Sequence, residues 1–398
     1  MTLRDLQAVE ASVCAAHGIP EDVQAEYYAR IGLGEISDEI LNDANSAKFS
    51  KRQSLCDLLA TMVEAANPSY DGRWQISQLL QESQRLDREI KASGSGTSTM
   101  SLSGIISNVA NKSLLTGFSD APKVMRQLAK VDSQSNYHER KFYRAELSGD
   151  FFGAVGASGE IKHGTLVETG YSVRPIQHGK QLGFSEEDML ADDLSVLTGA
   201  GIMLGDEAAR RVEFELSALL CEAMADVGSG NFFDSAVNYI NGSTTALSID
   251  SISTADGLLA AMTNSQGDPI SMNPTHLLVS GSNRATALQI RNSTEVRNAS
   301  ATGREPVGNP YQNEFDVMNS NWLLSGRHAN PCAPESWFLA SVSRMSAPLL
   351  LQFVGSDVPT VRNFANDPQR LGVTMRATLP FGVALFEPKS IIASKGKA

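Results

Sequence analysis

The strongest apolar pattern in the 398-residue chain lies between residues 192 and 227. Apolar side chains recur there every three or four residues, as on one face of an α-helix: Leu197, Ala200, Leu204, Ala208, Val212, Leu216, Leu219, Leu220 and Met224. Asp192 or Asp193 can cap this helix, and Gly228 can end it. At ~1.5 Å per residue, about 33 residues would span roughly 50 Å. Three glycines leave a kink or a later start open: Gly199, Gly201 and Gly205.

A second pattern predicts a long β-hairpin ahead of this helix. Residues 142–155 and 160–184 form two strand-like runs around a glycine-rich polar segment. Side chains alternate at period two in the second run: Thr165, Val167, Thr169, Tyr171 and Val173. Such a hairpin has too little apolar surface for a core of its own. We therefore expect it to project and to lie on another surface.

The first quarter of the chain differs from the rest. Residues 1–91 have the spacing of several short helices separated by polar breaks, with candidates near residues 6–16, 23–31, 36–44, 51–66 and 74–91. A tract of Gly, Ser and Thr follows at residues 92–99. Such tracts join domains and are cut by proteases. We place the main boundary here and expect any cleavage between residues 91 and 100.

The remaining segments predict an arm followed by a mixed α/β unit. Residues 101–130 carry an amphipathic pattern that suits an extended or helical arm. Within residues 245–350, helices are expected near 254–263 and 284–290. Short apolar runs predict strands at residues 276–280, 315–318, 337–342 and 349–354. Residues 372–378 and 382–386 are expected to pair as a hairpin that turns at residues 380–382.

Charge argues against direct binding of nucleic acid. The chain has 33 basic and 45 acidic residues, a net charge of −12, and no basic stripe. Residues 1–98 hold 15 acidic and 9 basic side chains, so they carry −6 of this charge. The first quarter is therefore expected to be a separate, acidic leader.

The cysteines and the hydropathy favour a reducing compartment and no membrane. Four scattered cysteines form no CxxC pair, so neither a zinc site nor a disulfide framework is expected: Cys14, Cys56, Cys221 and Cys332. No stretch of ~18 uncharged apolar residues occurs, and no apolar segment of a signal peptide follows Arg4 and Asp5.

No motif predicts an enzyme. The six histidines lack metal-binding spacings, no G-x-S-x-G elbow occurs, and the glycine-rich run at residues 153–159 lacks the lysine of a phosphate loop. An acidic cluster is expected to favour the start of the long helix, with a divalent-cation site as the alternative: Glu186, Glu187, Asp188, Asp192 and Asp193. We therefore predict no catalytic residue, no metal site and no cofactor.

Several short segments, in order, resemble one protein family. They include GEIKHGTL at 159–166, GFS at 183–185, LVS at 278–280 with RATAL at 284–288, STEVR at 293–297, LGV at 371–373 and FGVAL at 381–385. Together they resemble tailed-phage major capsid proteins over residues 100–392, in particular the Mu-like branch that is often fused to a Clp-type prohead protease. The protease is not in this sequence, which leaves open whether a separate protease trims the chain.

The resemblance implies an α+β fold, the tailed-phage major capsid fold, with six parts. These would be a helical scaffold-like leader and linker (1–98), an N-terminal arm (99–141), an extended hairpin loop (142–172), a peripheral domain with the long spine helix (173–240), an axial domain (241–350) and C-terminal strands returning to both domains (351–398). It also implies a possible covalent crosslink between a hairpin lysine and an asparagine, for which Lys162 and Asn363 are the candidates.

The function implied is that of a homo-oligomeric shell protein. Hexamers and pentamers would form an icosahedral shell that encloses double-stranded DNA without sequence-specific binding, with portal, prohead protease and cement proteins as partners. The location would be the virion, after assembly in the host cytoplasm. Two alternatives stay open at this point: an encapsulin-like cargo shell, and a self-processing protease or hydrolase.

Overall fold

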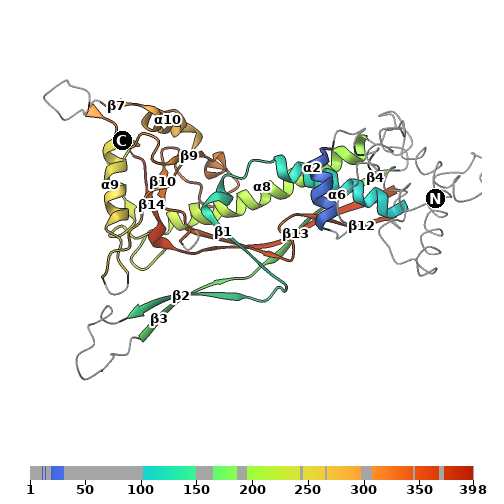
Figure 1. Ribbon diagram of the computed structural model, residues 1–398, viewed down its shortest axis with the longest axis horizontal. Helices are drawn as coiled ribbons and strands as arrows, with labels where there is room; N and C mark the ends of the chain where they lie inside the picture. Colours follow the sequence, from blue (N-terminus) through green and yellow to red (C-terminus); the bar gives the residue numbers. More distant parts are fainter. Residues whose placement is uncertain are drawn as a thin grey trace, which may run out of the picture. The chain divides into compact units, whose positions relative to one another are not determined.

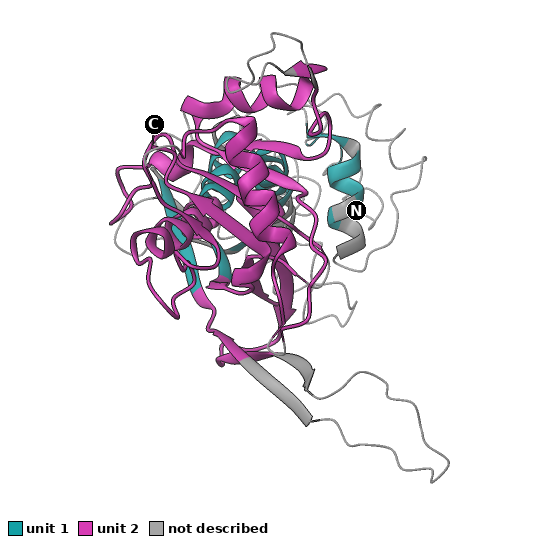
Figure 2. Ribbon diagram, turned by 90° about the vertical axis from the view of Figure 1, so that its left-hand side faces the viewer, with its two compact units in different colours: residues 1–122, 177–210, 356–380 teal, residues 123–176, 211–355, 381–398 magenta. Residues whose placement is uncertain are grey.

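The computed structural model describes residues 11, 14, 19–30, 102–148, 165–185, 195–242, 245–264, 267–296, 307–343, 346–366 and 372–397. They fall into two compact units, each made of segments distant in the sequence (Figure 2). Unit 1 comprises residues 1–122, 177–210 and 356–380, and unit 2 comprises residues 123–176, 211–355 and 381–398. Helices and mostly antiparallel sheets occur in both, which confirms the α+β class.

The long helix is α8, Ser195–Ala225, with 31 residues (Figure 1). It begins ahead of its three glycines, so the alternative of a later start is wrong. Within unit 1, a side chain at Gly201 would collide with Ser113 of α6 (Leu102–Asp120), and one at Gly205 would collide with the backbone of Leu114. The two glycines therefore let the two helices approach closely.

The rest of unit 1 surrounds α6. Helix α2 (Glu21–Arg30) packs against α6, which places Tyr27 5.7 Å from the ammonium of the fully buried Lys112. On β12 (Thr360–Asn366), the Val361 amide donates to Asn111 Oδ1 of α6 at 2.7 Å. The helical form of the predicted arm is thus confirmed for residues 102–120, as is the helix expected near residues 23–31.

One sheet has the strand order β1-β11-β13-β12, with β4 (Ile176–Ser185) also paired to β13. In unit 2, β1 (Ala129–Gln134) runs parallel to β11 (Leu349–Val354). The predicted hairpin around residue 380 is wrong, because β13 is one strand, Gly372–Leu385. Pro380 has no amide hydrogen to donate, and it lies between the residues of β13 that pair with β12 and those that pair with β11. The strand therefore continues through the proline.

The second sheet forms the core of unit 2. Its order is β5-β14-β10-β6-β9: Tyr239–Ile240, Ile391–Ser394, Trp337–Ala340, His276–Val279 and Asp316–Asn319. Every residue of β10 and β14 is buried. Helices α9 (Ile249–Ala260) and α10 (Arg284–Asn292) pack against it. The expected strands at 276–280, 315–318 and 337–342 are confirmed to within two residues at their ends, as is the strand at 349–354.

Helix α9 begins five residues before the predicted start. Ser248 is its N-cap: the hydroxyl accepts from the Ser251 amide at 3.1 Å, and the Ser251 hydroxyl accepts from the Ser248 amide at 2.8 Å. This reciprocal pair satisfies two amides that would otherwise lack partners. The remaining short elements are η1 (Met125–Leu128), η2 (Gly281–Asn283), β7 (Glu295–Val296), β8 (Val307–Gly308), η3 (Asn321–Leu324) and η4 (Pro388–Ser390).

The expectation that the cysteines form no disulfide is wrong. Cys221 on α8 and Cys332 form one, across 111 residues of sequence. No spacing motif could reveal a pair that only the tertiary fold brings together. The prediction of a reducing compartment, which rested on the absence of a disulfide, loses that support.

Several predictions lie outside the described residues. They are the helices near residues 36–44, 51–66 and 74–91, the linker at 92–99, the glycine-rich run at 153–159 and the acidic cluster at 186–193.

Candidate assembly surface

The most distinctive surface is a two-stranded ribbon. Strand β2 (Arg140–Ser148) pairs antiparallel with β3 (Thr165–Val173) along their full length, from Arg140 opposite Val173 to Ser148 opposite Thr165. Figures 1 and 2 show the ribbon running away from the body of unit 2. The projecting hairpin is thus confirmed, but the second predicted run is two strands. Pro175 separates β3 from β4, and β4 pairs with β13 instead.

The inner face of the ribbon is anchored by aromatic packing at its root. Phe142 and Tyr171 contact the ring of Phe386, with centroids 6.3 and 5.1 Å apart. Together with the buried Val173 and Leu350, they form a small apolar cluster. Aromatic pairs of this kind contribute about 0.5–1.5 kcal/mol beyond their buried area. This cluster therefore fixes the ribbon where it leaves the sheet.

Two basic side chains contact the aromatic rings at the root of the ribbon, where it joins the body of unit 2. The ammonium of Lys130 lies 5.2 Å from the Phe386 ring centroid, and the guanidinium of Arg140 lies 4.8 Å from that of Phe142. Arg140 also pairs with Asp132 at 3.1 Å. Partly exposed contacts of these kinds contribute ~1 kcal/mol or less each. The apolar cluster is therefore the main anchor, and the cations orient it.

The outer face of the ribbon is open to solvent where it is described, at the root next to Phe142. Successive residues of a strand point to opposite faces, so Tyr143 faces away from the cluster that holds Phe142. Its side chain is 59 % exposed, and the residue across from it is Gly170, which has no side chain to cover the ring. A large aromatic side chain is thus presented to solvent at the root of the ribbon.

Other exposed apolar side chains cluster along the same stretch of sequence. Among the described residues of unit 2, the exposed large hydrophobic residues are Val131, Tyr137, Tyr143, Ile176 and Val237. Four of these five lie between residues 131 and 176: Val131 on β1, Tyr137 between β1 and β2, Tyr143 on β2 and Ile176 at the start of β4. Exposed apolar residues that form one contiguous patch mark interaction surfaces, so these residues are candidates for a contact with another subunit.

A buried carboxylate holds the segment that leads into β1. Glu213 of α8 is 2 % exposed, and its two oxygens accept from the amides of Met125 at 2.8 Å and Arg126 at 3.2 Å. These are the first amides of η1, which would otherwise lack partners. Burial raises the pKa of Glu213, and the hydrogen bonds oppose the shift in part. The apolar periodicity of α8 gave no sign of this role.

The described residues contain no cluster of side chains suited to a metal ion. Among them, no three His, Cys, Asp or Glu side chains gather closely enough to hold a metal ion. No helix in the described part of the chain is long and apolar enough to cross a membrane. Lys162 lies outside the described residues, and Asn363 lies on β12 where the pairing with β13 shifts register. The proposed crosslink is therefore untested.

Comparison with known proteins identifies the family. The sequence profile described as "Phage capsid protein" matches residues 170–394, more than half of the chain. No curated relative matches the chain.

Solved structures with a similar arrangement include viral particles. The capsid structure of cyanophage P-SCSP1u has a TM-score of 0.45 at 11 % identity, covering 69 % of this chain and 88 % of that chain. A virus-like particle from Pyrococcus furiosus has a TM-score of 0.42 at 12 % identity, covering 72 % and 97 %. The procapsid of bacteriophage JBD30 has a TM-score of 0.37 at 13 % identity, covering 74 % of both chains. On the match of the profile, this chain belongs to the phage capsid protein family and is a structural protein of the virion shell.

Proposed function

We propose that copies of this capsid protein assemble as hexamers and pentamers into a closed icosahedral shell around double-stranded DNA. The observation that carries the proposal is the root of the ribbon, where Phe142 packs on its own subunit and Tyr143, on the opposite face, is exposed. A two-stranded ribbon is marginally stable in water by itself. A neighbouring copy would cover Tyr143 and complete the ribbon on its second face.

The charge of the chain supports enclosure of DNA without binding to it. A net charge of −12 repels the phosphate backbone, and the sequence contains no basic stripe that would neutralise it. A shell built from such acidic subunits would enclose DNA without binding it strongly. The role would be structural rather than catalytic.

Each segment of the chain would then correspond to one part of the capsid fold. Residues 99–141 would be the arm, 142–172 the extended loop, 173–240 the peripheral domain, 241–350 the axial domain and 351–398 the returning strands. The leader at residues 1–98 would act as a scaffold and could be removed by a prohead protease between residues 91 and 100. Portal and cement proteins would be further partners, and assembly would take place in the host cytoplasm.

Replacement of Tyr143 by serine tests the proposal. The variant should fold as the wild type does, because the side chain is exposed, but it should form far fewer particles in light scattering and negative-stain microscopy. Truncation of an aromatic residue at the centre of an interface commonly costs ~2 kcal/mol or more. Val237→Ser is the matched control, because Val237 is also exposed in unit 2, at 44 %, but lies away from the ribbon in sequence.

Two results would count against the proposal. A wild-type chain that stays monomeric at high concentration would contradict assembly itself. Equal assembly of the wild type and the Tyr143→Ser variant would contradict the role of the ribbon.

A further inference from the structure

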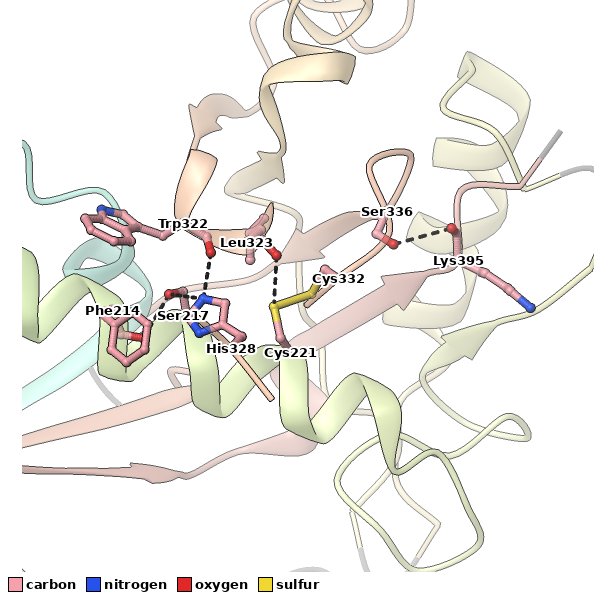
Figure 3. Close-up of a disulfide and its surroundings, with 9 residues drawn as sticks. All are labelled: Phe214, Ser217, Cys221, Trp322, Leu323, His328, Cys332, Ser336 and Lys395. Atoms are coloured by element: carbon pink, nitrogen blue, oxygen red, sulfur yellow. Dashed lines mark hydrogen bonds between the residues drawn. A yellow bond between two sulfur atoms is a disulfide. The ribbon is translucent and has the colours of Figure 1, made fainter. Parts of the chain in front are cut away.

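One face of α8 holds the segment of residues 321–332 in place. Phe214, Ser217 and Cys221 recur at three- and four-residue spacing, so they lie on one side of the helix (Figure 3). The Phe214 ring stacks on His328, with centroids 4.7 Å apart, and meets the edge of Trp322 at 6.2 Å. These two aromatic contacts dock the start and the middle of the segment.

His328 adds a buried polar contact to the docking. Its Nε2 lies 2.6 Å from the carbonyl oxygen of Trp322 and 3.2 Å from Ser217 Oγ. A carbonyl can only accept, so Nε2 carries the proton and donates it. The Ser217 hydroxyl donates to the Phe214 carbonyl at 2.9 Å, which leaves its oxygen free to accept from His328. These noncovalent contacts therefore hold residues 321–332 on α8 independently of a disulfide.

The same docking places the two cysteines within bonding range. The Cys332 amide donates to the Leu323 carbonyl at 3.0 Å, and that carbonyl lies 3.5 Å from the Cys221 sulfur. The Cα atoms of Cys221 and Cys332 are 5.3 Å apart, within the usual range of about 4.4–6.8 Å for a disulfide. The Leu323 carbonyl also gives the Cys221 thiol an acceptor when the pair is reduced. The fold thus holds the two cysteines where a disulfide can form, with a carbonyl acceptor beside Cys221.

Burial shelters the pair once the segment is docked. Cys221 is 1 % exposed and Cys332 is 8 % exposed. A reductant must bring a thiolate into line with a disulfide sulfur, and burial obstructs that approach. Closing and opening of the bond therefore both require the segment to leave α8 transiently, and a closed bond, which holds the segment in place, is reduced only slowly in the native protein.

We propose that Cys221 and Cys332 form a late redox brace, open during assembly in the cell and closed after exposure to an oxidising medium. The inference rests on the proposed assembly in the host cytoplasm, where thiols are kept reduced. With a small disulfide such as oxidised glutathione as oxidant, one cysteine thiolate displaces one glutathione thiol. The second cysteine then displaces the other, so the pair loses two electrons and two protons and two glutathione thiols are released. The closed bond fixes residues 321–332 on α8.

The test uses the full-length chain purified under reducing conditions. After treatment with oxidised glutathione, alkylation and peptide mass spectrometry should show a Cys221–Cys332 bond that resists dithiothreitol until denaturant is added. The Tm should rise by at least about 4 °C, because the bond closes a long loop of the unfolded chain. Cys221→Ala should abolish the rise, whereas Cys14→Ala, which removes a buried thiol of unit 1 that is not part of a disulfide, should retain it.

Three results would overturn the brace. The two cysteines could remain alkylatable after oxidation, or the Tm of the wild type could rise no more than that of Cys221→Ala. The bond could also be found closed in cells lysed directly into alkylating agent, which would contradict its late formation. None of these readouts requires particles, so a failure of the brace is distinguishable from a failure of assembly.

Discussion

Two β-structures of unit 2 differ in how completely this chain covers them. The sheet centred on β10 is closed: all four residues of β10 and all four of β14 are buried, and α9 and α10 pack against it. The ribbon of β2 and β3 is covered on one face, where Phe142 packs, and open on the other, where Tyr143 is 59 % exposed. The first is fully covered within one subunit, whereas the second leaves an aromatic side chain exposed that we propose a neighbouring subunit covers.

The difference follows from the amount of apolar surface that each can bury. The β10 sheet belongs to a core of fifteen buried apolar residues, which includes Trp337, Leu339 and Ile392. Complete burial of one such side chain stabilises the fold by about 1.5–3 kcal/mol. The ribbon's own cluster contains three buried residues. The ribbon therefore depends on its attachment at the root, where Tyr143 is left exposed.

The largest effect is expected in the closed sheet. Leu339→Ala should lower the free energy of unfolding by about 2–5 kcal/mol and the Tm by about 5–20 °C, because it leaves a cavity in a fully buried strand. Calorimetry of the two proteins measures this. Ile176→Ala, at a residue 57 % exposed beside the ribbon, should change the free energy by less than about 0.5 kcal/mol. Similar decreases in the free energy of unfolding from both substitutions would contradict the difference between the two regions.

The same contrast between covered and open positions extends to α8 in unit 1. Gly205→Ala should destabilise the protein by about 1–3 kcal/mol, since the added methyl would meet the backbone of Leu114. Gly199→Ala should stabilise it by up to about 1 kcal/mol, because nothing lies within 4 Å and alanine is the better helix former. Denaturant unfolding of the two variants measures opposite signs for the same substitution. Two shifts of the same sign would contradict the close packing of α6 on α8.

A smaller effect is expected at Glu213, which holds the segment ahead of β1. Its pKa is raised in the folded state, so the folded protein binds more protons than the unfolded chain from about pH 4.5 up to the raised pKa. Stability from this group is therefore present at low pH and is lost as the pH rises through that window. Glu213→Gln should remove this pH dependence. When the Tm of both proteins is measured at several pH values, the difference between wild type and variant should therefore change with pH.

Glu215→Gln serves as the control for this experiment. Glu215 lies on the same helix and pairs with Arg211, with its side chain 26 % exposed. The prediction would be contradicted if the pH dependence of the Tm persisted in Glu213→Gln and disappeared in Glu215→Gln. The pH dependence would then come from Glu215 and not from Glu213.

Local patterns in the sequence predicted much of the fold. The strand at 349–354 and the helix of α8 follow from runs of apolar residues and from helical spacing, which are local properties. The break at Pro175 and the continuous β13 depend on which strands pair, and pairing is a property of distant segments. The disulfide between Cys221 and Cys332 was unpredictable for the same reason.

The assembly surface was predictable in kind but not in detail. Alternation in β3 predicted a projecting hairpin, and the lack of a core around it predicted a need for a second surface. Which face is covered depends on Phe386, which is more than 200 residues away in sequence from Tyr171 and meets it only in the fold. The exposure of Tyr143 and the hydrogen bonds of Glu213 likewise required the structure.

Hydroxyl-radical footprinting of Tyr143 in free subunits and in assembled particles tests the central claim most directly. The exposed Val237 provides an internal reference. If a neighbouring subunit completes the ribbon, the labelling of Tyr143 relative to Val237 should fall several-fold on assembly. Equal relative labelling in subunits and particles would contradict the account.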